Sequence, residues 1–368
     1  MEEDVGYRTV QSAGRGSFII SLPKKWVQEI GIGKGSQIAI KIMEDMSLIM
    51  VPRKIVEGRI NKGAGRSGEY YINVNRTSDP KSLCRRLISL YATSSEIIHL
   101  NFGAVENSKE FRTAVTNLAK NLLLGTEVIE ETSEEMTLQV LINHPELPID
   151  KAIRRMANLS LSAHKDAIAA LGNLNEDFIE AIYKIKTDVD RVNLYVVRQL
   201  KFGITQNMFR EWGFKTSKEF LGYRLVANDI KNIAENALTI GKNMKSLRRL
   251  IDDKLLALKD NVDEEAYSQI KDFSSLAEQL FEDSLNSLFN RNYEQADRII
   301  SRTESFLVLE NDLITLLFNK KMDPNLLSIY RLVLDNSRRI VEYSREIAEV
   351  TLNRTVEETS LTVAEGLV

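Results

Sequence analysis

The sequence predicts a multidomain, mainly α-helical protein: a small β domain, a small α/β domain and then two tandem three-helix bundles. Three observations lead to this fold class. The chain has 368 residues, enough for two or three domains. It has only 18 Gly and 6 Pro, too few for the many turns of an all-β fold. After residue 149, apolar residues recur at three- and four-residue intervals, which is typical of amphipathic helices.

The first predicted domain, residues 5–55, consists of short strands separated by glycine-containing turns, with proline at the start of one short helix. The expected elements, in order, are strands at 8–11 and 17–22, a helix at 24–30, and strands at 37–43 and 47–53. So short a segment with so few apolar residues can hardly bury a core alone. We therefore expect it to need a partner chain.

The second predicted domain, residues 68–145, alternates strands and helices. The expected elements are a strand at 69–74, a helix to residue 92 capped by Asp79-Pro80, a strand at 96–102, a helix at 108–124, and strands at 127–131 and 137–142. This order implies a small open sheet with helices on one face.

The third region contains six long amphipathic stretches, grouped as bundles at 149–251 and 262–356. The expected helices are 149–171, 176–203, 216–250, 263–289, 292–319 and 324–355. The tetrapeptide Tyr223–Val226 recurs as Tyr330–Val333, and the match continues through two further turns. This repeat indicates duplication of a three-helix unit.

Several features exclude other classes of protein. No apolar run approaches the ~20 residues of a membrane span, and the N-terminus is acidic, so we expect a cytoplasmic protein with no membrane insertion. Cys84 is alone, which excludes an internal disulfide, and three scattered histidines form no His/Cys metal site. No catalytic constellation stands out, so the chain is not expected to be an enzyme. We expect Cys84 to be buried, His164 to lie on a helix surface, and Gly63–Gly68 to form a linker.

Charge is divided unevenly along the chain. Residues 5–66 contain eleven Lys or Arg and four acids, a net charge of +7, within a chain whose total is −3. The remainder is therefore strongly acidic. A basic segment joined to an acidic body is expected where one domain meets phosphate groups and the other meets a different partner.

The N-terminal segment resembles the swapped-hairpin DNA-binding domains of the SpoVT/AbrB family. The similarity is carried by Arg8–Gln11, Gly14-Arg15, Ile19–Lys25 and Gly31–Gly35. The resemblance implies a homodimer with interleaved hairpins, in which Arg8, Arg15, Lys24 and Lys25 contact DNA. Such side chains neutralise phosphates, and arginine can also reach base edges. The alternative is that this module only dimerises or binds a toxin-like protein.

The helical region resembles PhoU, the accessory protein of phosphate-uptake systems. The similarity is carried by Asp188–Arg191 through Leu200, Asp229–Glu235 and Arg338–Ser344. With both modules in one chain, the architecture is similar to archaeal phosphate-uptake regulators. The resemblance implies partners such as a phosphate ABC-transporter ATPase or another regulatory protein.

PhoU relatives that bind iron or another cation use an acid, three spacers and an aspartate on adjoining helices. Here Lys186, Lys231 and Arg338 replace the first acid, which predicts i,i+4 ion pairs on a charged face without metal. The candidate ligands for a divalent metal or iron are Asp188, Asp190, Asp229, Glu235, Asp335 and Glu342.

Together these observations predict a DNA-binding transcriptional regulator of phosphate uptake and phosphate homeostasis. The two helical bundles, residues 149–251 and 262–356, form a body that senses or docks the transport system. The α/β domain couples this body to the N-terminal domain, residues 5–55, which we call the head. Two alternatives stay open: an accessory protein acting only through protein–protein contacts, with the head used for dimerisation, and a metal-binding bundle protein.

Overall fold

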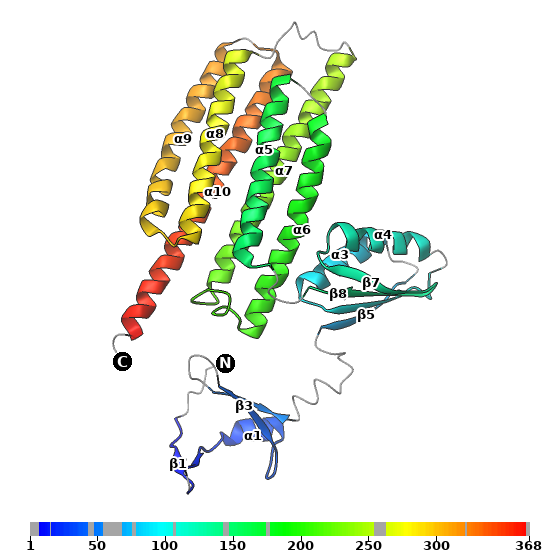
Figure 1. The fold of residues 1–368 in the computed structure, drawn as a ribbon, viewed down its shortest axis with the longest axis vertical. Helices are drawn as coiled ribbons and strands as arrows, with labels where there is room; N and C mark the ends of the chain where they lie inside the picture. Colours follow the sequence, from blue (N-terminus) through cyan, green and yellow to red (C-terminus); the bar gives the residue numbers. More distant parts are fainter. Residues whose placement is uncertain are drawn as a thin grey trace. The chain divides into compact units, whose positions relative to one another are not determined.

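The computed structural model describes residues 7–14, 16–42, 48–53, 68–75, 79–105, 108–142, 147–173, 177–253, 263–320 and 322–365. Contacts divide the chain into two units, residues 1–69 and 70–368, each with its own architecture (Figure 1). The finer division into four domains stays a prediction.

In its described residues, the first unit contains two β-hairpins and one short helix. Its elements are β1 (Gln11–Ser12), β2 (Phe18–Ile19), α1 (Lys24–Ile30), β3 (Ile38–Ile42) and β4 (Leu48–Pro52). β1 pairs antiparallel with β2, and β3 with β4. The helix has the predicted bounds and ends at Gly31, whose φ of 68° is readily adopted by glycine. The first two strands are much shorter than predicted.

The second unit begins with an α/β layer structure. Its elements are β5 (Glu69–Asn73), α3 (Pro80–Ala92), β6 (Ile97–Asn101), α4 (Ser108–Asn121), β7 (Thr126–Glu131) and β8 (Glu135–Val140). The strands form one sheet in the order β5-β6-β8-β7, and both helices cover the same face (Figure 1). Asp79 caps α3 by accepting a 2.9 Å hydrogen bond from the Ser82 amide, as the Asp-Pro pair predicts.

Six long helices follow in the part of the chain that the structure describes. They are α5 (Ile149–Asn173), α6 (Asp177–Gln206), α7 (Glu219–Asp252), α8 (Glu264–Phe289), α9 (Tyr293–Asn319) and α10 (Pro324–Glu365). Helices α5, α6 and α7 pack on one another, as do α8, α9 and α10, and contacts of α5 with α8 and α7 with α10 join the groups (Figure 1). One continuous apolar core runs through all six. The repeated residues Tyr223 and Tyr330 are both fully buried in it, which fits a duplicated unit.

A buried arginine fixes the α/β layers to the bundle. Nη1 of Arg198, on α6, donates hydrogen bonds to the carbonyl oxygens of Tyr91, at 2.9 Å, and Ser95, at 2.7 Å. Its guanidinium also lies 5.1 Å from the centre of the Tyr91 ring. In return, the Ser94 hydroxyl donates to the Arg198 carbonyl at 3.2 Å. Four contacts on one buried residue make this junction specific.

Two side chains differ from their predictions. His164 is fully buried rather than on a helix surface, because α8 covers that side of α5. Cys84 is half-buried rather than buried, with Sγ 3.9 Å from the Ala114 carbonyl oxygen. Arg15 and most of the Gly63–Gly68 linker lie outside the described residues. Among the helices that are described, none is long and apolar enough to cross a membrane.

Candidate functional site

Three of the residues predicted to contact DNA are described in the first unit, and their cationic side chains are exposed to solvent. Lys24 and Lys25 are exposed in the first turn of α1, and Arg8 is exposed just before β1. Arg8 Nη1 donates a 3.0 Å hydrogen bond to the neighbouring Tyr7 carbonyl oxygen. In the described part of the chain, none of the three is held by one of the protein's own carboxylates. Their charges therefore remain available to an external anion.

The same unit exposes an unusual amount of apolar surface. Tyr7 is 92% exposed and Phe18 75%, and Ile19, Ile20 and Ile40 are also exposed. Among the described residues of this unit, only Ile32 and Pro52 are buried. Exposed apolar side chains in this number are characteristic of an interaction site. That a partner chain covers these side chains stays a prediction.

Two of the candidate metal ligands are bridged by a lysine. Lys186 on α6 lies 2.8 Å from Asp190 Oδ2, one turn along its own helix, and 3.1 Å from Glu235 Oε2 on α7. Burial alone lowers the pKa of Lys186, but these two carboxylates outweigh it and raise that pKa. The Lys186–Asp190 pair is confirmed. Glu235, however, pairs with Lys186 of α6 rather than with Lys231 of its own helix.

On α10, arginines neutralise the candidates Asp335 and Glu342. Arg338 pairs with Asp335 at 2.8 Å and also with Glu342, as the i,i+4 pattern predicts. Glu310 of α9 lies 3.5 Å from Arg338, and Arg339 pairs with Asp335 at 3.1 Å. Burial acts to raise the pKa of Asp335, but the two arginines hold it below its usual value.

Asp229 and Asp188 lie in different surroundings. Asp188 is exposed on α6. Asp229 is buried on α7, and its pKa is raised to about 7, first by burial and then by Glu346 of α10. Among the described residues, no three His, Cys, Asp or Glu side chains gather as a metal would need. Lysine or arginine already pairs with four of the six candidates, Asp190, Glu235, Asp335 and Glu342, and the assignment of the six as metal ligands stays a prediction.

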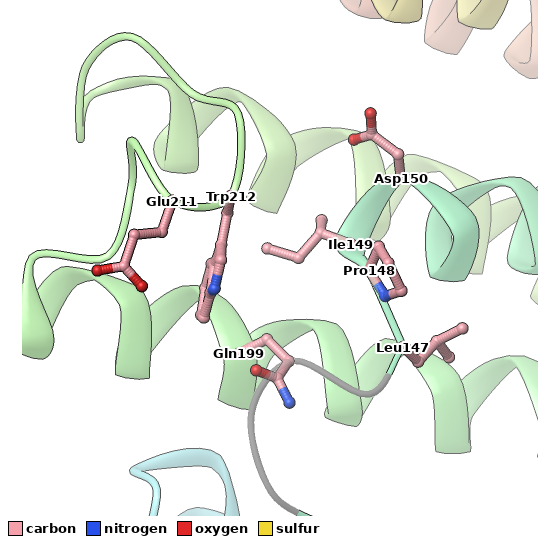
Figure 2. A pocket seen from close by; sticks show the side chains of 7 residues that line it. All are labelled: Leu147, Pro148, Ile149, Asp150, Gln199, Glu211 and Trp212. Carbon is pink, nitrogen blue, oxygen red and sulfur yellow. The ribbon is translucent and has the colours of Figure 1, made fainter.

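A small pocket lies where α5 begins. Its volume is about 200 Å³, below the range of most ligand pockets. Seven residues line it, from the start of α5, from α6 and from the loop before α7: Leu147, Pro148, Ile149, Asp150, Gln199, Glu211 and Trp212. Figure 2 shows Ile149 pointing toward the Trp212 indole, with the Asp150 carboxylate directed away from both. Four of the lining residues are apolar and two are acidic, and the lining contains no Lys or Arg that would pair with an anion.

The structure also reveals a buried polar pair that the sequence analysis missed. His164 Nε2 on α5 lies 3.8 Å from Glu278 Oε1 on α8, and Lys165 Nζ lies 3.7 Å from the other carboxylate oxygen. Burial lowers the pKa of His164 to about 4 and raises that of Glu278 to about 7. The signal was present in the sequence, because Leu161, His164 and Ile168 follow the spacing of a buried helix face.

Two segments of the chain match family models. Residues 11–57 match the model described as antidote-toxin recognition MazE, bacterial antitoxin, and residues 153–244 match the PhoU domain. The chain therefore carries a MazE/AbrB-like domain followed by a PhoU domain, which confirms both resemblances. The archaeal type stays a prediction.

Two solved structures are similar to the chain. The phosphate transport system regulatory protein PhoU from Streptococcus pneumoniae is 13% identical, with a TM-score of 0.44, over 55% of this chain and 91% of that one. PhoU from Pseudomonas aeruginosa is 12% identical, with a TM-score of 0.37, over 55% of this chain and 93% of that one. Comparison with curated proteins finds no match.

Proposed function

We propose that this protein is a DNA-binding transcriptional regulator of phosphate uptake and phosphate homeostasis. One observation carries the proposal: a MazE/AbrB-like head with open cationic side chains precedes a PhoU domain in the same chain. A PhoU domain suggests a role in phosphate homeostasis, and the head is compatible with DNA as a partner. The role of the body is then to sense or dock the phosphate transport system.

The arrangement of charge favours DNA as the partner of the head. Arg8, Lys24 and Lys25 are exposed, and no carboxylate of the described residues engages them, whereas Lys186 and Arg338 of the body each pair with two or more acids. Exposed cations can release counterions from a phosphate backbone, and this release provides sequence-independent affinity. Lys186 and Arg338 cannot do so without losing their own ion pairs.

The exposed apolar surface of the head supports a homodimer. Two heads that cover each other's Phe18 and Ile19 remove apolar side chains from water. A symmetric pair of heads also presents its cations twice, as a two-fold DNA site requires. The PhoU-like body then has a route to the head through the α/β layers, which Arg198 fixes to α6.

A mobility-shift titration of DNA with the full chain at rising salt tests the DNA-binding part. We expect retardation at low salt. In a variant with Arg8→Ala, Lys24→Ala and Lys25→Ala, the slope of log affinity against log salt should fall by about 3 per chain, because each lost phosphate contact removes about 0.9.

A matched control removes three cations of the body instead. Lys151, Arg155 and Lys184 are exposed on α5 and α6, and their replacement by alanine should leave the titration unchanged. If the full chain retards no DNA at low salt, or if both triple variants lose affinity equally, the head is not the DNA-binding element. The accessory-protein alternative, in which the head only dimerises, would then be favoured.

A further inference from the structure

The open face of the α/β sheet carries a row of side chains that crosses all four strands. Tyr71 of β5 stacks on His99 of β6, with ring centroids 4.5 Å apart and an interplanar angle of 14°. His99 Nδ1 lies 3.1 Å from Thr137 Oγ1 of β8, and that hydroxyl donates to Glu130 of β7 at 3.4 Å. Since the Thr137 proton goes to Glu130, the His99 Nδ1–H donates to Thr137. Each member of the row is therefore held by its neighbour.

Figure 1 shows α3 and α4 on one face of the sheet, with the other face left uncovered by them. In β6, Ile98 and Leu100 are buried against the helices, so His99 points to the opposite side. Tyr71 is 65% exposed although its ring is already fixed by the stack on His99. A fixed and exposed aromatic ring loses little conformational freedom when a partner covers it, which favours binding.

The charge of the open face is uniformly negative. The four strands contain five glutamates and no Lys or Arg. Glu131 pairs at 3.5 Å with Arg112 of α4, on the covered side. The other four belong to the open face by strand alternation and register: Glu69, Glu127, Glu130 and Glu135. Such a surface repels a polyanion and attracts a cationic partner.

We propose that this face is a docking surface for an arginine-rich segment of another protein. One guanidinium stacks on Tyr71, and further cations of the segment pair with Glu127 and Glu130. Arginine fits better than lysine, because its planar guanidinium both stacks on an aromatic ring and forms bidentate pairs with carboxylates.

The surface belongs to a segment that neither family model covers, so it is independent of the DNA-binding proposal. Its partner is also of opposite charge to DNA. The α/β layers are fixed to α6 by Arg198, so a protein docked on the open face is mechanically joined to the helical body.

Fluorescence anisotropy of the full chain with a labelled peptide of alternating arginine and glycine tests this inference. Wild type should bind the peptide. Tyr71→Ala should weaken binding about five- to tenfold, because stacking is lost at the centre of the contact. Tyr71→Phe should stay within about twofold, because the ring is kept. Glu130→Gln should cost about threefold, and its amide oxygen still accepts from Thr137.

The matched control is Tyr183→Ala on α6, an equally exposed tyrosine at 60%, which should bind as wild type does. Equal weakening in both alanine variants would overturn the proposal, since the acidic body would then bind the peptide without a defined site. Absence of binding by wild type would also overturn it. A further titration uses single-stranded oligothymidine, and a loss confined to that ligand in Tyr71→Ala would assign the face to nucleic acid instead.

Discussion

Asp229 is a carboxylate buried on α7, and its Oδ2 has no hydrogen-bond partner among the described residues. Its pKa is raised to about 7 by burial and by Glu346. The folded protein therefore favours the protonated acid more than the unfolded chain does. The stability that Asp229 contributes is complete below pH ~4 and is lost as pH rises through 7. The duplicated unit carries Asn336 at the matching position, a buried amide that cannot ionise.

This comparison predicts that Asp229→Asn raises the free energy of unfolding by about 2 kcal/mol at pH 8, where the native carboxylate must be charged, and has little effect near pH ~4, where the carboxyl is largely protonated in the unfolded chain as well. Urea denaturation at both pH values measures the difference. Glu346→Gln, which removes the neighbouring charge, should give a smaller gain in the same direction. An effect of Asp229→Asn that is equal at the two pH values would contradict the assignment of a raised pKa.

The surroundings of individual side chains were only partly predictable from the sequence. The spacing of His164 among apolar residues indicated burial, yet the type of residue favoured a surface position. The charges of Lys186, Asp190 and Glu235 were all visible, but a pattern within one helix could not show that Lys186 reaches across to α7. Contacts between helices depend on their rotation and offset, which one sequence does not reveal.

At the scale of elements, the long helices were predictable and the head strands were not. Six amphipathic stretches carry many turns of consistent spacing, so their bounds were found within a few residues except for α10, which extends to Glu365. In the head, the pairing that should stabilise strands over 8–11 and 17–22 covers only Gln11–Ser12 and Phe18–Ile19. The apolar residues around them are exposed, because the described chain alone gives them no core.

The junction of the α/β layers with α6 gives a prediction at the same scale. Arg198→Met keeps much of the side-chain volume but removes both hydrogen bonds: the Tyr91 carbonyl keeps its 3.1 Å bond from the Ser94 amide, whereas the buried Ser95 carbonyl loses its donor. We expect a loss of about 2–3 kcal/mol in docking. Hydrogen–deuterium exchange should increase at residues 91–95 while the bundle core keeps its protection.

Lys201→Met is the matched control, because Lys201 is exposed on the same helix. Unchanged exchange at residues 91–95 in Arg198→Met would show that Arg198 does not hold the two layers together. The coupling of the helical body to the head would then need another route.

At the scale of the whole molecule, the apolar surface of the head predicts a homodimer. Sedimentation of the full chain should give twice the monomer mass of 41.8 kDa. The double substitution Phe18→Ser and Ile20→Ser should shift it to the monomer, because both side chains are exposed in the isolated chain and are available to a second copy. The pair Leu307→Ser and Val308→Ser, on the exposed side of α9, should leave the mass unchanged. A monomeric wild type would contradict the swapped-hairpin expectation.

The central claim is that the cationic head binds DNA and that the PhoU-like body makes this binding depend on phosphate. Chromatin immunoprecipitation of the full chain, in the cells that make it and at high and low phosphate, tests this claim most directly. The account predicts enrichment upstream of phosphate-transport genes that changes with phosphate supply and disappears in the Arg8, Lys24 and Lys25 triple-alanine variant. Enrichment that persists in this variant, or no enrichment at any promoter by wild-type protein, would contradict it.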